Sequence, residues 1–279
     1  MGVRVVTDSA CDLPQDLIDE HQITVVPLTI RFGAEELVDR EELSTAEFWL
    51  RLRESDVLPE TAAPSAGAFE KAFRDLIGQG ASGIVCINLS SRLSATMQAA
   101  KVAADAVRPE CPVEVVDSLS CSMAVGELCL AAAERAAAGA ELAEIVADVV
   151  DRRDRTRLYG ALNTLEFLKK GGRIGNARAL LGSMLSIKPV VEVRDGVVEE
   201  AGKVRTRSKS LKLLADRVAA QPIDSLAVLH GEADDVDELV DLLAASYPRE
   251  HIRMGVVGPV IGTHAGPGVI GVTFVVSKA

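Results

Sequence analysis

The first half of the chain alternates short apolar runs with longer segments of helical spacing, and this alternation limits the fold more than any other feature. Apolar runs of strand length occupy residues 3–7, 83–88 and 113–116. Apolar residues recur with the period of a helix over 66–77, 96–107, 122–138 and 142–150. Strands that alternate with helices form a mostly parallel sheet with helices on both faces. The sequence therefore predicts an α/β/α layer structure for this half.

The second half orders its elements differently. Strands are expected at 156–162, 189–194, 197–201, 225–231, 252–257 and 269–276, with helices at 211–219 and 236–245. Asp195-Gly196, between two of these strands, is typical of a hairpin turn. The 279 residues suffice for two domains, and we interpret the charged run 151–155 as a solvated seam between them. We therefore expect domains of residues 1–153 and 154–279.

The charge and the cysteines exclude several classes of protein. A net charge of −11 suits neither a general nucleic-acid binder nor adhesion to an anionic membrane, because both need a basic surface. No window has the length of a transmembrane helix, and residues 1–7 are too short and strand-like for a signal peptide, so we expect a cytoplasmic protein. Five cysteines without a Cys-x-x-Cys pair and four histidines without ligand spacing predict no metal site.

The segment 165–189 combines a positioned charge with an apolar wall. Its first helical turn breaks at Gly171-Gly172, places Arg173 on the break and restarts as a helix at about residue 177. Arg173 is then aimed by the backbone, although an ordinary helix C-cap with a solvated arginine also fits the pattern. The apolar residues of the second helix are expected to face a core or an apolar ligand: Leu180, Leu181, Met184, Leu185 and Ile187.

Hydroxyl side chains gather in loops that follow predicted strands. Thr7-Asp8-Ser9 suits either a binding site at a strand end or the cap of the next helix. Ser65 is placed to cap the helix 66–77, whereas Thr61 has no capping role and is free for a ligand. Ser90, Ser91, Ser94 and Thr96 precede a helix N-terminus, which favours an anion; capping by one serine is the alternative.

Two further features could serve binding or could be purely structural. His264 lies in a segment with four glycines and two prolines, 258–268, which we interpret as a stiff loop that either meets a ligand or serves packing. A basic run on this acidic chain fits a solvated helix start or a docking patch for an acidic partner or for phosphates. Its members are Lys203, Arg205, Arg207, Lys209 and Lys212.

Taken in order, these segments resemble the DegV family, which includes the fatty-acid-binding subunit of bacterial fatty acid kinase. The resemblance covers essentially the whole chain and rests on Thr7-Asp8-Ser9 with Asp12-Leu13-Pro14, Thr61-Ala62-Ala63-Pro64-Ser65, Ser90-Ser91-Arg92-Leu93-Ser94-Ala95-Thr96, Gly171-Gly172-Arg173-Ile174 and Gly262-Thr263-His264-Ala265-Gly266-Pro267-Gly268. Two departures stand out. Ala62 replaces a serine that the family usually has, and Ala95 and Met97 replace a glycine and a tyrosine, which is expected to alter the pocket.

The resemblance implies an N-terminal α/β domain, a C-terminal α+β domain and a long-chain fatty acid between them. It implies that Thr61 and Ser94 hold the carboxylate, that His264 lies close by, and that Arg173 serves phosphoryl transfer. The protein would then be a non-catalytic carrier without a cofactor, monomeric alone. It would present its ligand to the ATP-dependent catalytic subunit of a fatty acid kinase, which makes an acyl phosphate for phospholipid synthesis. Lys203, Arg205, Arg207 and Lys209 would dock that partner.

Two other functions stay open at this stage. The chain could be an α/β enzyme that uses His264 as a base, although it has neither a phosphate-binding Gly-x-x-x-x-Gly-Lys-Ser/Thr loop nor a Gly-x-Ser-x-Gly elbow. It could also be a regulatory module that senses a lipid. The sequence does not indicate acyl length, unsaturation or branching, because the pattern does not locate the end of the pocket.

Overall fold

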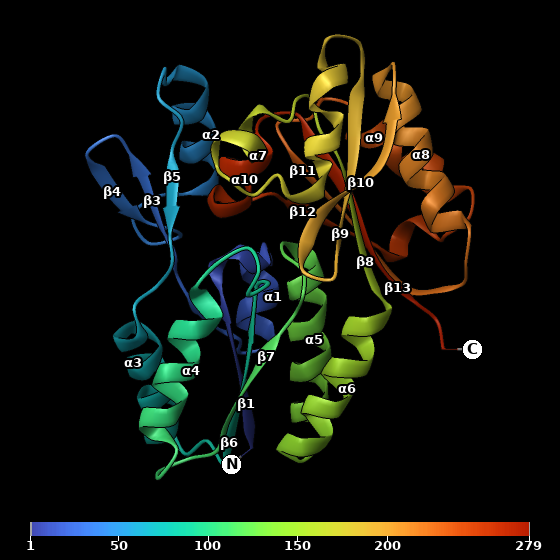
Figure 1. The fold of residues 1–279 in the computed structure, drawn as a ribbon. Coiled ribbons are helices and arrows are strands. Elements are labelled where there is room, and N and C mark those ends of the chain that lie inside the picture. The colour runs from blue at the N-terminus through green and yellow to red at the C-terminus, as the bar shows by residue number, and fades with distance from the viewer. Residues whose placement is uncertain (1, 279) are drawn as a thin grey trace.

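The fold is taken from a computed structural model, which describes residues 2–278 and, within them, all side chains except those of 181–186. Two α/β parts lie one above the other (Figure 1). No helix within 2–278 is long and apolar enough to span a bilayer.

The N-terminal part contains a four-stranded parallel sheet in the order β2-β1-β6-β7. Its strands are β1 (Val3–Asp8), β2 (Thr24–Val26), β6 (Gly83–Asn88) and β7 (Val113–Asp117). The chain moves from β1 to β2 on one side and later to β6 on the other, so the strand order reverses between β1 and β6. Ligands of such sheets bind beyond the carboxyl ends of the strands at this point. In Figure 1 these ends point towards the C-terminal part.

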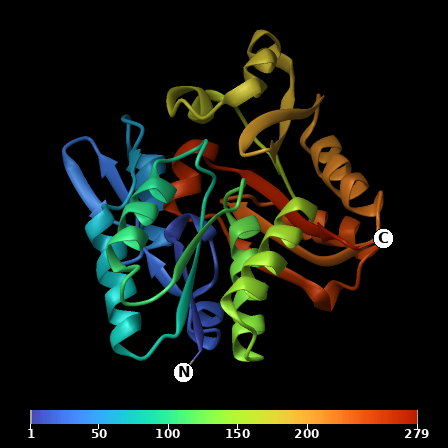
Figure 2. The ribbon, with the colours of Figure 1, turned by 60° about the horizontal axis from the view of Figure 1, so that its bottom comes forward.

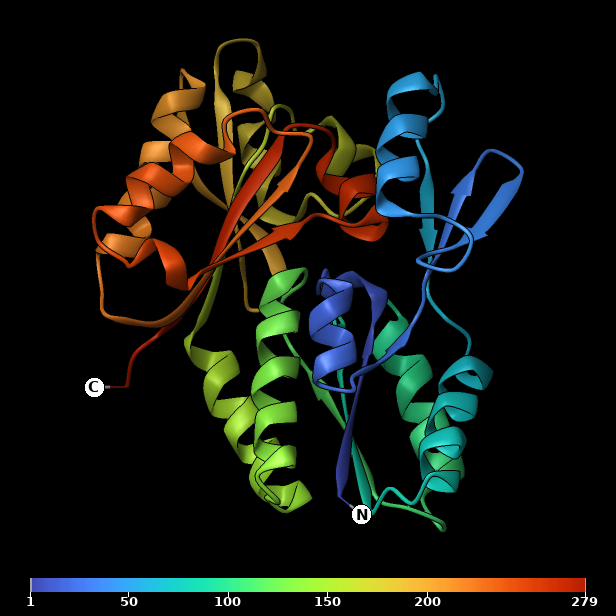
Figure 3. The same ribbon diagram turned by 180° about the vertical axis from the view of Figure 1, so that it is seen from behind.

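Helices cover both faces of this sheet, as the alternation predicts. On one face, α3 (Ala66–Gly78) and α4 (Thr96–Val107) pack on Ile84 and Cys86. On the other face, α5 (Met123–Ala137) and α6 (Leu142–Arg155) pack on Val85 and Ile87. The short helix α1 (Gln15–Glu20) lies beside α5 in the view from behind (Figure 3). The predicted α/β/α layers are confirmed.

Residues 29–62 leave the sheet and reach the C-terminal part. Residues 24–32 form two strands on either side of Pro27, β2 and β3 (Thr29–Phe32). β3 pairs with β4 (Glu35–Val38) and β5 (Glu60–Ala62) in a small antiparallel sheet. The helix α2 (Thr45–Glu54) binds the second part through Trp49, whose Nε1 donates to the carbonyl of Val257 at 3.0 Å. This excursion carries Thr61 to the boundary between the two parts.

The C-terminal part contains a six-stranded mixed sheet in the order β10-β9-β8-β13-β11-β12. Its strands are β8 (Thr156–Ala161), β9 (Lys188–Arg194), β10 (Val197–Val204), β11 (Ile223–Gly231), β12 (Ile252–Val256) and β13 (Val269–Val276). Neighbouring strands are antiparallel except β11 and β12. The helices α8 (Arg207–Ala219) and α9 (Val236–Ala244) cover one face. In Figure 2 the yellow segment with the β9–β10 hairpin projects from the rest of this sheet.

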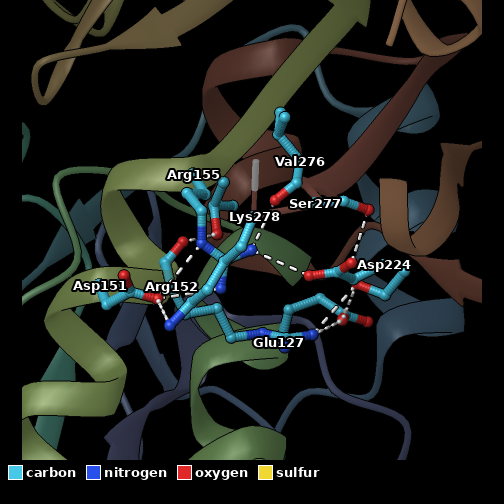
Figure 4. Close-up of polar contacts among 10 residues, drawn as sticks. Glu127, Asp151, Arg152, Arg155, Asp224, Val276, Ser277 and Lys278 are labelled. Atoms are coloured by element: carbon cyan, nitrogen blue, oxygen red, sulfur yellow. Dashed lines mark hydrogen bonds and ion pairs between the residues drawn. The ribbon is translucent and has the colours of Figure 1, made fainter. Parts of the chain in front are cut away.

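A charged cluster joins the two parts where α6 passes into β8 (Figure 4). Glu127 of α5 is 1% exposed and accepts hydrogen bonds from Arg152, Ser225 and Arg253. Arg155 bonds Asp151 of its own helix and Asp224 of β11. A buried carboxylate needs such partners, since its removal from water is costly. The interpretation of 151–155 as a solvated seam is therefore wrong for Arg152 and Arg155, which connect the two parts.

Candidate functional site

A cavity of about 240 Å³ lies where the loops that follow β2, β6 and β7 meet the inner face of the six-stranded sheet. Its walls are mainly aliphatic side chains from both parts, among them Leu28, Leu93, Leu162, Val191, Val198 and Leu229. An apolar wall of this kind favours a hydrocarbon, because each buried methylene contributes about 0.8 kcal/mol.

Four residues singled out in the sequence line this cavity together: Thr61, Ser94, Arg173 and His264. They come from β5, the loop before α4, the loop after α7 (Glu166–Lys170) and α10 (Pro259–Ala265). Thr61 Oγ1 lies 3.0 Å from His264 Nε2. These side chains give the mainly apolar cavity a polar cluster, and Ser122 and Glu192 also line it.

His264 stands in a helix, so the expectation of a loop at this position is wrong. Pro259 occupies the first turn of α10, where its missing N–H costs nothing. A Cβ at Gly262 would lie 2.5 Å from Phe48, so glycine allows α10 to pack against α2. A Cβ at Gly171 would lie 2.2 Å from His264 Nδ1. The glycines of both segments thus permit close packing around the histidine rather than a flexible loop.

His264 is neutral at physiological pH. Burial lowers the pKa of its imidazole to about 4, and the nearby charge of Arg173 lowers this pKa as well. Nδ1 is buried and has no hydrogen-bond partner among the described residues. We assign the proton to Nε2, because Nδ1 then carries only a lone pair and leaves no buried donor unsatisfied. Nε2–H donates to Thr61 Oγ1, and the hydroxyl proton of Thr61 is free for a ligand.

Ser94 is the hydroxyl of its loop that lines the cavity. Ser90 donates to the carbonyl of Gly196 and Ser91 to Asp117, so both are engaged elsewhere. Ser94 Oγ lies 2.9 Å from Thr96 Oγ1 at the start of α4. The N-cap residue of α4, Ala95, provides no capping side chain. The positive end of the helix dipole therefore lies beside Ser94, which favours an anionic group there.

Arg173 is fixed at the edge of the cavity. It follows Gly172, whose φ of +71° suits glycine. Its Nε donates to the carbonyl of Leu93 at 3.0 Å and its Nη1 to that of Gly171 at 2.7 Å. The guanidinium is therefore held by backbone from both parts rather than solvated at a helix end.

The helix expected from residue 177 is a 3₁₀ segment, η2 (Gly175–Ser186). Gly175 starts it with a φ of +52°, and a Cβ there would lie 2.3 Å from the carbonyl oxygen of Val198. Leu180 is 1% exposed and Ile187 packs against the main core, as expected. The expected apolar contacts of Leu181, Met184 and Leu185 lie outside the described side chains.

The first polar loop serves the fold. Asp8 accepts hydrogen bonds from the N–H groups of Ala10 and Leu89 and from Asn88 Nδ2, and burial raises its pKa to about 6. Asp8 caps only the 3₁₀ turn Ser9–Cys11, and α1 has Pro14 at its N-cap without a capping side chain, so the expected cap for the helix near Gln15 is wrong. Thr7, Asp8 and Ser9 do not line the cavity either.

Sequence reasoning missed Asp12. Its carboxyl accepts from Ser122 Oγ and from the N–H of Gly258, the residue before α10. Asp12 thereby anchors the start of the helix that carries His264. Its φ of +51°, unusual for a residue other than glycine, could not be read from the sequence.

The basic run divides into exposed and engaged side chains. Lys203, Arg205 and Lys209 are exposed. Arg207 forms two hydrogen bonds with Asp235, at 2.6 and 2.9 Å, so its charge is used within the C-terminal part. Arg207 is thus poorly placed for docking, because its guanidinium already has a carboxylate partner.

Comparison with known proteins agrees with this architecture. The DegV family model matches residues 2–277. A DegV domain-containing protein of Streptomyces coelicolor is 40% identical over 276 residues, which is 97% of each chain.

Two solved structures have the same fold. One, described as showing fatty acid binding of a DegV family protein from Thermus thermophilus, superposes with a TM-score of 0.91 at 34% identity and covers 99% of this chain and 100% of that one. Another is DegV of Bacillus subtilis, described as a fatty acid binding protein, with a TM-score of 0.86, 29% identity and coverage of 99% and 100%. The predicted two-domain α/β fold is confirmed, and this chain belongs to the DegV family.

Proposed function

We propose that the protein binds a long-chain fatty acid in this cavity and presents its carboxylate to a separate ATP-dependent kinase subunit in the cytoplasm. The observation that carries the proposal is a cavity with mainly aliphatic walls in which Thr61, Ser94 and His264 provide hydrogen-bonding groups from both parts of the chain. The fatty-acid-binding descriptions of the Thermus and Bacillus relatives support it.

The polar cluster suits a carboxylate that must stay reactive. The hydroxyls of Thr61 and Ser94 are neutral donors, and burial of the acyl chain provides most of the affinity. A direct ion pair with arginine would stabilise the carboxylate more strongly and make it a poorer nucleophile. Arg173 is held by two carbonyl oxygens instead. The headgroup would therefore be positioned without being neutralised.

In the proposed reaction, a carboxylate oxygen attacks the γ-phosphorus of ATP on the kinase. An oxygen–phosphorus bond forms, the bond from the γ-phosphorus to ADP breaks, and the product is an acyl phosphate for phospholipid synthesis. Negative charge on the transferred phosphoryl group needs a fixed cation. Arg173 would supply it, and His264 would orient Thr61. The exposed Lys203, Arg205 and Lys209 would attract an acidic surface of the kinase.

The alternative of an enzyme with His264 as base is less favoured. A histidine with a pKa of about 4 is a weak base at neutral pH. Its Nε2 also faces a threonine hydroxyl rather than an activated nucleophile with a third orienting group.

The test separates binding from transfer in one variant pair. Arg173→Ala should bind palmitic acid with an affinity within about threefold of wild type. With ATP and the catalytic subunit of a fatty acid kinase, it should lose about 100-fold or more in acyl-phosphate formation. Arg178→Ala is the matched control, since Arg178 is exposed on the same segment and does not line the cavity.

The opposite pattern would overturn this assignment. Weak binding with a normal maximum rate would make Arg173 a headgroup ligand. A wild-type protein that binds palmitic acid but gives no product with any such kinase would leave a lipid sensor as the better function.

A further inference from the structure

A pair of glycines interrupts the floor of the cavity, which is the face of the six-stranded sheet that lines it. Gly160 of β8 and Gly271 of β13 are directly opposite each other on adjacent antiparallel strands, and both line the cavity. The neighbouring inward-facing residues Leu158, Leu162 and Val269 have large aliphatic side chains. The floor therefore has a gap in the middle of the sheet, where branched side chains would be expected.

Gly271 has a structural reason to be glycine. A Cβ at this position would lie 2.7 Å from the carbonyl oxygen of Tyr159. A side chain here would force β8 and β13 apart, because backbone atoms cannot give way as a flexible side chain can.

Gly160 has no such reason. Its φ is not in the left-handed region, and the nearest atom to an added Cβ among the described residues would be Val191 Cγ2, at an ordinary 3.8 Å. Glycine inside a strand weakens it and commonly marks the close approach of a ligand. β8 is flanked by β9 and β13, yet Gly160 keeps accessible surface. Because Gly160 lines the cavity, that surface belongs to the cavity.

Gly160 also lies between the two ends of the cavity. Leu162 follows β8 and leads into the segment with α7 and Arg173, at the polar cluster. Leu158 lies at the other end, where it and Val193 are shared with a second, polar cavity of about 420 Å³. At about 3.3 Å per residue, Gly160 is about 7 Å from Leu162 along the strand. An acyl chain that runs from Thr61 towards Leu158 would pass over Gly160.

We propose that Gly160 provides the space through which the acyl chain passes and thereby determines the acyl length that the protein accepts. This inference rests on the proposed fatty-acid binding. A side chain at position 160 would occupy the path beyond the first part of the chain. Short fatty acids would keep their contacts, and longer ones would lose those of every methylene past the obstruction.

The experiment measures affinity against acyl length. Delipidated wild type, Gly160→Ala and Gly160→Val are titrated calorimetrically with octanoic, lauric, palmitic and stearic acids. Octanoic acid should bind all three proteins within about twofold. For the longer acids the loss of affinity should grow with acyl length, by up to about fourfold for each methylene that is displaced from the cavity. The valine variant should show the larger loss.

Two control variants define what the result means. Ser94→Ala removes a headgroup donor and should weaken every acid by a similar factor. Gly67→Ala adds the same methyl group in α3, where the nearest atom is Ser65 Oγ at 3.7 Å, away from the cavity, and should leave the length profile unchanged. Circular dichroism and thermal melts confirm that each variant is folded, and Gly160→Ala serves if the valine variant is not.

A uniform loss at all lengths, or no loss in a folded Gly160 variant, would overturn the role of Gly160 while the fatty-acid function stands. A wild-type protein that binds none of the four acids would contradict the proposed function itself.

Discussion

At the scale of single residues, carboxylate binding depends on whether the hydroxyl proton of Thr61 is free to donate. His264 Nε2 faces the Thr61 hydroxyl at 3.0 Å, and the imidazole is neutral because its pKa is about 4. With Nε2–H as donor, the threonine oxygen accepts and its own proton can point to a carboxylate. His264 and Thr61 therefore form a chain of two hydrogen bonds, one from the imidazole to the threonine oxygen and one from the threonine hydroxyl to the carboxylate. Loss of either bond affects the ligand.

Thr61→Val tests this donor, since valine keeps the branched shape and removes the hydroxyl. Loss of one hydrogen bond to a charged group costs about 1.5–3 kcal/mol, so palmitic acid should bind about 10- to 100-fold more weakly. Thr61→Ser keeps a hydroxyl and should bind nearly as wild type. Equal affinities of Thr61→Val and wild type, measured by calorimetry, would move the headgroup site elsewhere.

That Thr61 is a candidate ligand contact could be predicted from the sequence, whereas the protonation state of His264 could not. Ser65 caps α3 through the N–H of Ala68, as the sequence indicated, which leaves Thr61 without a capping role. The lowered pKa of His264 depends on its burial and on Arg173, distant in sequence.

At the scale of elements, the β9–β10 hairpin closes one side of the boundary between the parts. Its Asp195-Gly196 turn was predicted, and both residues have positive φ, as such a turn requires. The contacts that hold it could not be predicted, since they join residues about 100 positions apart. Ser90 Oγ donates to the carbonyl of Gly196 at 2.8 Å, and Arg92 Nη1 donates to that of Asp195 at 2.9 Å.

Ser90→Ala combined with Arg92→Ala should release this turn from the N-terminal part. Net contributions of about 1 kcal/mol for each hydrogen bond predict that palmitic acid dissociates about 5- to 30-fold faster, with little change in the association rate. Stopped-flow displacement measures both rates. Arg194→Ala is the control, because Arg194 pairs with Glu192 on its own strand. Unchanged dissociation would mean that the hairpin does not gate the ligand.

The elements that sequence reasoning misplaced share one cause. The conformations of η2 and α10 follow from close contacts with Val198 and with Phe48, which local propensity does not encode. The bounds of the helices α3, α4 and α5 were predicted closely, because the helical spacing of their apolar residues can be read from the sequence.

At the scale of the whole molecule, buried charged groups join the two parts, and both parts contribute residues to the wall of the cavity. The parallel sheet could be predicted from its alternation of strands and helices, but the excursion of residues 29–62 and the pairing order of the mixed sheet could not. The excursion depends on contacts between the two parts, such as Trp49 with Val257. The pairing order depends on strands far apart in the sequence, such as β8 and β13.

Asp12 makes the stability of this junction depend on pH. Burial raises the pKa of its carboxyl from 3.8 to about 7, although bonds from Ser122 and Gly258 and the charge of Arg40 lower it. Between these values the folded state holds a proton that the unfolded state has lost, so this group's contribution to stability falls as pH rises. Asp8 and Asp39, with pKa values of about 6, act in the same direction. His264, lowered to about 4, acts in the opposite direction.

Asp12→Asn should flatten this dependence, because the amide does not titrate. Its oxygen can accept from the N–H of Gly258, and its nitrogen can donate to Ser122 Oγ, which then accepts instead of donating. From about pH 5 to about pH 8 the variant should gain about 1–3 kcal/mol in free energy of unfolding relative to wild type. Urea unfolding at each pH measures it. Asp56→Asn, at an exposed loop position, should follow wild type. A parallel course of Asp12→Asn and wild type would show that Asp12 is already ionised in the folded protein.

The central claim is that the cavity holds a fatty acid, and lipid analysis of the protein purified from bacteria tests it most directly. Organic extraction and mass spectrometry should yield up to one long-chain fatty acid per folded chain. Readdition of palmitic acid to delipidated protein, at about 100 times its dissociation constant, should stabilise the fold by about 2.7 kcal/mol and raise Tm by several degrees. A well-folded protein that repeatedly yields no fatty acid, and whose Tm does not respond to palmitic acid, would contradict the claim.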